Sequence, residues 1–286
     1  MKYLYFPGCS LKGTGKAYEE SLLAVFRALG IELREIEDWN CCGATAYMSV
    51  DEVKSYALAG RNLALAERED LDVIAPCSAC YLVLNKTQKS LQDHPDIRRK
   101  VVGALQAAGL DYKGKVKVRH PLDVLVNDVG LDEIARRIKT PLKGKKFAPY
   151  YGCQIVRPFA SFDDQYNPVT MDKLLRATGA ECVTYPLKTR CCGGSLTGTL
   201  PEVGVRLAYI LVKEAKKRGA EAMVTVCPLC QFNLDGYQDQ IARKYEAVDI
   251  PIVYFTQVLG LAMGLPASEL GLKRGIVSTA AVLAGR

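Results

Sequence analysis

The sequence predicts an α/β protein made of two tandem repeats, each with a mainly parallel sheet and a cysteine group at the carboxyl ends of its strands. Three observations support this fold class. One cysteine pattern occurs twice, strand-like and helix-like segments alternate, and each repeated cysteine group follows a predicted strand. Such alternation is typical of parallel sheets whose strands are connected by helices.

The two cysteine sets share their order and part of their spacing. Each has a single cysteine, then Cys-Cys-Gly, then Cys-x-x-Cys, and in both sets thirty-four residues separate the pair from the Cys-x-x-Cys. This internal repeat accounts for ten of the eleven cysteines. The first set is Cys9, Cys41, Cys42, Cys77 and Cys80, and the second is Cys153, Cys191, Cys192, Cys227 and Cys230.

The first repeat contains three predicted strands, and each leads to a cysteine group. Gly30 ends the first helix, and Ser49-Val50-Asp51-Glu52 forms a capping box that opens the second, which runs to about Arg68. Apolar residues three and four apart support the helices. The strands are predicted at 2–6, 31–36 and 72–75, and the first and third helices at 17–29 and 78–92.

The middle of the chain is less regular. Helices are predicted at 96–108, 120–128 and 132–139, and a strand at 116–118. The segment 141–146, with one glycine and three lysines, is the predicted domain boundary. It divides an N-terminal cluster-binding domain, residues 1–143, from a C-terminal one, residues 144–286.

The second repeat follows the same plan. Strands are predicted at 146–150, 181–185 and 222–226, and a helix at 171–178. A second capping box, Thr199-Leu200-Pro201-Glu202, opens a helix with Pro201 in its first turn. That helix is predicted to bury one apolar face, which consists of Val203, Leu207, Ile210, Leu211 and Ala215.

Parallel sheets bind ligands outside the carboxyl ends of their strands. Each Rossmann-like repeat should therefore bring its five distant cysteines together at one edge. The tail, residues 266–286, has no counterpart in the repeat and is expected to be a packing arm or a contact with another subunit.

Composition narrows the class of protein. No apolar run reaches the roughly 18–20 residues of a membrane-spanning helix, and an export signal would remove Cys9. We therefore expect a cytoplasmic protein, in which many cysteines indicate metal binding or catalysis. The formal charge of +7 comes without a basic helix interleaved with aromatics, so nucleic acid is not an expected partner. An anionic substrate or an acidic redox partner is compatible with that charge.

Five thiols in each set exceed what one tetrahedral zinc ion or one cubane [4Fe–4S] cluster needs. Adjacent cysteines suit a cluster, because neighbouring sulfurs can reach different irons. Glycines beside the ligands would let the backbone approach inorganic sulfide. These are Gly8, Gly43, Gly152, Gly193 and Gly194. The alternative is one [4Fe–4S] cluster in one repeat and zinc in the other.

On these motifs the chain resembles the B subunit of heterodisulfide reductase, to about residue 260. Matching stretches are 3–9, 151–153, 167–168 with 177–180, and 226–230. The resemblance implies a non-cubane [4Fe–4S] cluster in each repeat. The implied ligands are Cys9, Cys41, Cys42, Cys77 and Cys80 for one cluster, and Cys153, Cys191, Cys192, Cys227 and Cys230 for the other.

The resemblance also implies reductive cleavage of a disulfide at the interface of the repeats, with one electron to each sulfur and iron binding each leaving thiolate. Electrons would come from two partners of the reductase complex, the iron–sulfur C subunit together with the flavin and iron–sulfur A subunit. This chain itself has neither a G-x-G-x-x-G after a strand nor a P-loop. In methanogenesis the family's substrate is the mixed disulfide of coenzyme M and coenzyme B. Relatives in bacteria lack both coenzymes.

Two other classes of function stay open. One is the same clusters in another anaerobic redox role, as in sulfur-oxidising heterodisulfide-reductase-like complexes or the cysteine-rich modules of fumarate, succinate and glycolate dehydrogenases. The other is a structural zinc or electron-relay module without a substrate.

Four residues outside the repeated pattern are candidates for other roles. His120, after the strand at 116–118, is a candidate catalytic proton donor to a departing thiolate, or else a capping or packing residue. Cys182 is expected to be a small apolar core residue and His94 an exposed loop residue. Trp39, near the first Cys-Cys pair, either shields a cluster from water or packs in the core.

Overall fold

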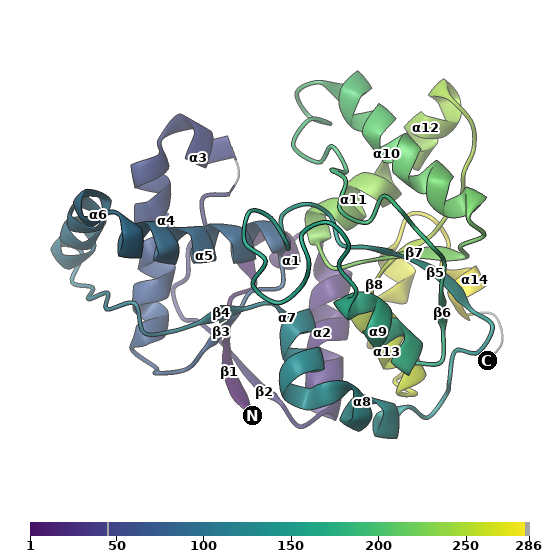
Figure 1. The fold of residues 1–286 in the computed structure, drawn as a ribbon, viewed down its shortest axis with the longest axis horizontal. Coiled ribbons are helices and arrows are strands. Elements are labelled where there is room, and N and C mark those ends of the chain that lie inside the picture. The colour runs from purple at the N-terminus through teal and green to yellow at the C-terminus, as the bar shows by residue number, and fades with distance from the viewer. Residues whose placement is uncertain (45, 284–286) are drawn as a thin grey trace. The chain divides into compact units, whose positions relative to one another are not determined.

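The computed structural model describes residues 1–44 and 46–283 (Figure 1). The chain forms two compact units. Unit 1 is Met1–Cys9 with Leu29–Pro121, and unit 2 is Ser10–Ala28 with Leu122–Arg286. The division of the cluster-binding repeats at residue 143 stays a prediction, because the compact units follow packing and place residues 10–28 and 122–143 with the second sheet.

Unit 1 is built on a four-stranded, all-parallel sheet with the order β2-β1-β3-β4. Residues Tyr3 to Tyr5 of β1 are buried, as expected for the central strand of a covered sheet. The strands are β1 (Lys2–Tyr5), β2 (Glu32–Glu35), β3 (Val73–Ile74) and β4 (Val118–Arg119).

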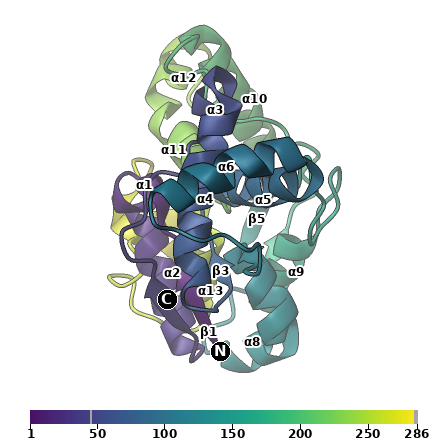
Figure 2. The ribbon, with the colours of Figure 1, turned by 90° about the vertical axis from the view of Figure 1, so that its left-hand side faces the viewer.

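The helices of unit 1 pack mainly on one another (Figures 1 and 2). Helix α4 contacts both α5 and α6. Gly60 permits the approach of α6, because a Cβ at this position would lie 3.3 Å from Val101 Cγ1. The helices are α3 (Ala46–Val50), α4 (Glu52–Glu67), α5 (Ser78–Asp93) and α6 (Pro95–Ala107).

Unit 2 repeats this plan with a parallel sheet of order β6-β5-β7-β8. The strands are β5 (Lys146–Tyr150), β6 (Glu181–Cys182), β7 (Ala222–Thr225) and β8 (Ile252–Tyr254). The same order in both sheets confirms the predicted α/β class with Rossmann-like repeats. Strand β8 was not predicted, because its apolar run continues without a break into the helix that follows it.

Helices cover both faces of the sheet of unit 2. Helices α10, α11 and α12 lie on one side, and α2, α9 and α13 on the other (Figures 1 and 2). Around the sheet the helices are α2 (Lys16–Ala28), α9 (Thr170–Ala177), α10 (Pro201–Lys217), α11 (Pro228–Gly236), α12 (Gln238–Lys244) and α13 (Phe255–Ala262). The shorter segments are α1 (Gly8–Lys12), α7 (Pro121–Asp123), the π-helix η1 (Val124–Gly130), α8 (Leu131–Arg137), the 3₁₀ helix η2 (Leu272–Arg274) and α14 (Ala280–Leu283).

Helix α2 belongs to the first repeat by sequence but packs in unit 2 against α13. The Tyr18 ring stacks on Tyr254 with centroids 4.4 Å apart. The Ser21 and Thr256 hydroxyls form a buried hydrogen bond of 2.7 Å. The apolar face that predicted this helix is therefore buried by a partner more than two hundred residues away in sequence.

The tail is a packing arm of unit 2 over its described residues. The Asp235 carboxylate of α11 accepts hydrogen bonds from the Ile276 and Val277 amides, at 2.7 and 3.1 Å. Arg274 donates two hydrogen bonds to Glu20 of α2. Among the described residues, no helix has both the length and the apolar character that crossing a bilayer requires.

Two predicted helix starts were wrong. The N-cap of α4 is Asp51, whose carboxylate accepts from the Lys54 amide at 3.0 Å, because Ser49 is already inside the short helix α3. The N-cap of α10 is Leu200 instead of Thr199, whose hydroxyl turns back to the Ser195 and Leu196 carbonyls. Pro201 is in the first turn, as predicted.

The buried face of α10 also differs from the prediction. Leu211 and Ala215 are buried as predicted, but Val203 and Ile210 are 45% and 42% exposed. The helix instead buries a face that begins at Gly204, because Gly204 lies against Thr197 and Gly193 too closely for a side chain. The rotation that this contact imposes cannot be deduced from apolar periodicity.

We predict that Phe26→Ala lowers the free energy of unfolding by about 3–5 kcal/mol, because Phe26 is fully buried on α2. Urea unfolding of the full chain measures the effect, with exposed Arg27→Ala as the control on the same helix. Equal small losses for the two variants would contradict the packing of α2.

Candidate functional site

In each unit the cysteines gather where the order of the strands reverses. Strands β1 and β3 are neighbours in the sheet. The chain continues from β1 to β2 on one side and from β3 to β4 on the other side, so these two connections run in opposite directions. Cys9 follows β1 and Cys77 follows β3. Ligands of open α/β sheets bind at this switch point. Cys153 and Cys227 occupy the corresponding places after β5 and β7.

The first cysteine quintet (Cys9, Cys41, Cys42, Cys77, Cys80) converges through its sulfurs. The Sγ atoms of Cys42 and Cys80 are 3.3 Å apart, and Cys80 also shares a hydrogen bond with Cys77. Cys77 is the N-cap of α5, and Cys80 stands in its first turn. Three thiols are buried (Cys42, Cys77 and Cys80), and two are exposed (Cys9 and Cys41).

The second cysteine quintet (Cys153, Cys191, Cys192, Cys227, Cys230) has the same construction. Cys230 shares hydrogen bonds with Cys192 and Cys227, and Cys191 does so with Cys153. The buried thiols are Cys192, Cys227 and Cys230, while Cys153 is half-buried and Cys191 exposed. Each quintet thus anchors three sulfurs in the protein and leaves the same two positions accessible from outside.

Contacts among the thiols shift their pKa values in both quintets. Hydrogen bonds from Cys41 and Cys80 lower the pKa of Cys42 to about 4, and the same contact raises the pKa of Cys41. In the second quintet, hydrogen bonds from Cys153 and Cys192 lower the pKa of Cys191 to about 2. Sharing of hydrogen bonds thus favours the thiolate, the form that binds metal, at one sulfur of each quintet over its neighbour.

Glycines let the backbone reach these sulfurs. A Cβ on Gly8 would lie 2.9 Å from Cys80 Sγ, and a Cβ on Gly152 would lie 3.0 Å from Cys230 Sγ. Both residues have positive φ, at 64° and 72°. A side chain at either position would push the first cysteine of its set away from the Cys-x-x-Cys.

A buried asparagine holds the chain at each Cys-Cys pair. Asn62 of α4 accepts from the Asn40 amide and donates to the Asn40 carbonyl, each at 2.9 Å. Asn233 of α11 donates to the Cys192 carbonyl. Sequence analysis missed both residues, because they occupy different positions in the two repeats and lie on helices predicted only as packing elements.

The donor set fits an iron–sulfur cluster in each quintet. Five thiols in each quintet exceed the needs of one tetrahedral ion. Two buried donors beside the quintets have no hydrogen-bond partner among the described residues, the Ser78 hydroxyl and Arg157 Nε. Hydrogen bonds to cluster sulfur are a normal role for such groups.

The surroundings of the two quintets differ. Beside the first, the Phe6 ring meets the Trp39 ring edge-on, with centroids 5.6 Å apart. The positions that correspond to Phe6 and Trp39 hold Tyr150 and Thr189. The Tyr150 hydroxyl donates to the Arg190 carbonyl at 2.7 Å, and burial with the nearby thiols of Cys230, Cys192 and Cys153 raises its pKa.

The four candidate residues outside the cysteine pattern differ in their burial. His120 is fully buried, with Nε2 3.0 Å from the Pro76 carbonyl and its ring edge-on to Tyr81. Cys182 is half-buried on β6, where burial raises its pKa to about 11. Trp39 is half-buried, and its indole N–H donates to Glu35. His94 is exposed between α5 and α6.

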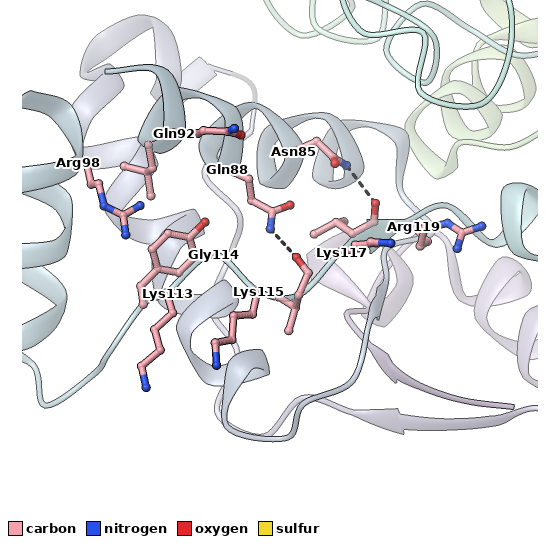
Figure 3. A pocket seen from close by; sticks show the side chains of 13 residues that line it. Asn85, Gln88, Gln92, Arg98, Lys113, Gly114, Lys115, Lys117 and Arg119 are labelled. Atoms are coloured by element: carbon pink, nitrogen blue, oxygen red, sulfur yellow. Dashed lines mark hydrogen bonds between the residues drawn. The ribbon is translucent and has the colours of Figure 1, made fainter. Parts of the chain in front are cut away.

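A cavity of about 690 Å³ in unit 1 contains none of the cysteines. It lies between α5 and residues 112–119 (Figure 3). Gln88 and Asn85 donate to the Val116 and Val118 carbonyls on the open side of edge strand β4. Exposed Lys113 and Lys115 point away from α5. Occupied carbonyls and lysines are typical protection of an edge strand, so this region has a structural explanation.

We predict that Gly8→Ala lowers the bound iron of the full chain by roughly half, because the added Cβ meets Cys80 Sγ and disturbs one of two sites. The matched control is Gly30→Ala, which has a similar φ of 72° but no atom within 4 Å of the added Cβ. Iron analysis after oxygen-free purification measures both. Equal iron in the two variants would refute the steric argument.

Comparison with known proteins matches both repeats to one family model. The model describes a cysteine-rich domain, CCG, and matches residues 3–85 and 147–235. In a solved structure from Helicobacter pylori, described as a hypothetical protein, the fold recurs with a TM-score of 0.78 at 13% identity. The match covers 97% of this chain but only 52% of that one.

Curated relatives match over nearly the whole chain. A protein of Archaeoglobus profundus, named as similar to the B subunit of heterodisulfide reductase, is 35% identical, covering 94% of this chain and 93% of its own. The 8-methylmenaquinol:fumarate reductase membrane anchor subunit of Wolinella succinogenes is 34% identical, covering 96% and 97%. The B subunit of the ferredoxin:CoB-CoM heterodisulfide reductase of Methanosarcina mazei is 29% identical, covering 99% and 96%. The chain therefore belongs to the CCG cysteine-rich family that includes the B subunit of heterodisulfide reductase.

Proposed function

We propose that this protein is the catalytic iron–sulfur subunit of a heterodisulfide reductase or reductase-like complex, and that it cleaves a disulfide reductively. The observation that carries the proposal is the duplicated quintet, with three buried and two accessible sulfurs in each copy. Reductive cleavage of a disulfide needs two electrons, one for each sulfur. Two sites that each handle a single electron match this requirement. The proposed cofactors are two non-cubane [4Fe–4S] clusters.

The reaction balances as R–S–S–R′ + 2 e⁻ + 2 H⁺ → R–SH + R′–SH. The S–S bond breaks, both sulfurs are reduced, and the clusters supply single electrons when bound. The electrons originate in partner subunits with iron–sulfur and flavin groups, which we propose to be the C and A subunits of the complex. A cytoplasmic location is proposed with them, since free thiols in this number suit a reducing compartment.

The chain's own residues divide the work within each quintet. Cys42, Cys77 and Cys80 are buried among strand ends and the start of α5, so they would hold the cluster and exclude water from it. Cys9 and Cys41 are exposed, so the reacting side of the cluster would be theirs. In the second quintet Cys153 and Cys191 have the corresponding roles.

His120 remains the proposed proton donor from the sequence, with packing as its alternative. Its contacts favour the alternative, because the ring is fully buried and faces the Pro76 carbonyl immediately before Cys77. A residue that fixes this turn would act on catalysis through the position of Cys77.

A second candidate function is supported by one observation. The relative named as the membrane anchor subunit of 8-methylmenaquinol:fumarate reductase is as similar as the reductase subunits and covers its own length equally well. In that role the same two clusters would pass electrons from a quinol-linked partner to a fumarate-reducing one, without a disulfide.

We predict about eight iron atoms and eight sulfides per chain after oxygen-free purification, four for each cluster. Cys42→Ser and Cys192→Ser should each lower the iron to about four atoms, because each removes a buried ligand from one quintet. The matched control is Cys182→Ser, the cysteine outside the repeat, which should keep all the iron. About four irons with one zinc would instead support the mixed-metal alternative.

Turnover is the test of the reaction. The complex isolated with this subunit is given reduced viologen and candidate disulfides, and two thiols should form for every two electrons consumed. Cys191→Ser should lower the rate by at least about 100-fold, since loss of outer partners of a metal ligand alone costs 10–100-fold. Quinol-dependent fumarate reduction without turnover of any disulfide would establish the second candidate in its place.

A further inference from the structure

The two quintets share their donors but differ in the charge beside them. Arg157 lies four residues after Cys153, whereas the fourth residue after Cys9 is Gly13. One guanidinium N–H of Arg157 donates to the carbonyl of Thr189, two residues before Cys191. The side chain therefore bridges the loop after β5 and the loop that carries the second Cys-Cys pair.

The remaining bonding capacity of Arg157 is unused. Its Nε is buried and has no hydrogen-bond partner among the described residues, and no ion pair joins Arg157 to a carboxylate there. Its charge lies near the site, because the Thr189 carbonyl that it binds is only two residues before Cys191. Among the described residues, a cation without a carboxylate partner is thus held beside the loop of the second Cys-Cys pair.

The first quintet has apolar groups in the corresponding place. The Phe6 and Trp39 rings pack edge to face, and Phe6 is fully buried. A cation also lies beside this quintet, since Arg61 donates to the Asp38 carbonyl and to Asn40 Oδ1, one residue before Cys41. Unlike Arg157, Arg61 forms an ion pair with a carboxylate, that of Asp38, which compensates its charge.

We propose that Arg157 is a positioning residue that makes the two clusters unequal, by raising the reduction potential of the cluster held by the second quintet above that of the first. The proposal rests on the proposed function, because it assumes a cluster in each quintet. The second cluster would then be the stronger electron acceptor, and negative charge would be more stable at the second site than at the first.

The physical basis is the charge that reduction adds. One electron makes a cluster more negative, and a nearby guanidinium stabilises that form relative to the oxidised one. The same charge stabilises an anionic thiolate at the accessible side of the site. Beside the first quintet the aromatic pair is uncharged and Arg61 is paired with Asp38, so the first cluster would lose electrons more easily.

The test is a redox titration of the full-length chain, purified without oxygen and followed by EPR and visible absorbance. In Arg157→Gln one of the two midpoint potentials should become more negative by at least about 59 mV, a tenfold change for one electron. The affected signal should be the one that Cys191→Ser alters and Cys41→Ser does not. Arg157→Lys, which keeps the charge, should restore most of the shift.

The exposed Arg206 on α10 provides the matched control, since Arg206→Gln removes the same charge from a side chain in solvent. Unchanged potentials in Arg157→Gln with full iron would overturn the proposal, as would equal shifts of both signals. Equal loss of the second cluster in the Gln and Lys variants would also overturn it, because the role would then be structural. Failure of the proposed function is distinct: iron is present, but no disulfide is turned over.

Discussion

The rest of the site depends on one constraint: the backbone must approach a cysteine sulfur closely where the first strand of each sheet ends. Gly8 and Gly152 place their Cα atoms where any Cβ would meet the last cysteine of the set. Only with this approach can the cysteine after the first strand and the cysteines at the start of the helix after the third strand bind the same group. The strand order then explains why these two segments are neighbours, because the sheet reverses its connections between them.

Packing divides the chain differently from the cysteine repeat. Helix α2 is the first helix of the first repeat, but its apolar face is buried by α13 in unit 2, and its Glu20 pairs with Arg274 of the tail. Unit 2 therefore depends on residues at both ends of the chain. A fragment that begins after the predicted boundary at residue 143 would lack Tyr18 and Phe26, and would expose the α13 surface that they cover.

Duplication supplies two similar sites, and the residues outside the quintets make them different. The ten cysteines keep the same division into buried and accessible positions in both copies. Around them, an aromatic pair stands in one copy. In the other, the Tyr150 hydroxyl and the Arg157 guanidinium each donate to a backbone carbonyl. Relatives named for heterodisulfide reductase and for fumarate reductase match this chain at 35% and 34% identity.

Sequence alone determined the α/β class, the repeat, the strand before each cysteine group and the family. These features are local or periodic: an apolar run, a turn glycine, or a spacing of thirty-four residues that recurs. The assignment of the ten cysteines as cluster ligands is a prediction from sequence, and the structure adds which thiols lie close together and which are exposed. Tertiary structure decided the partner of α2, the exposed side of α10, and the places of Asn62 and Arg157 beside the cysteine loops. Each of these depends on a contact between segments that are distant along the chain, and apolar periodicity shows that a face is buried without showing what buries it.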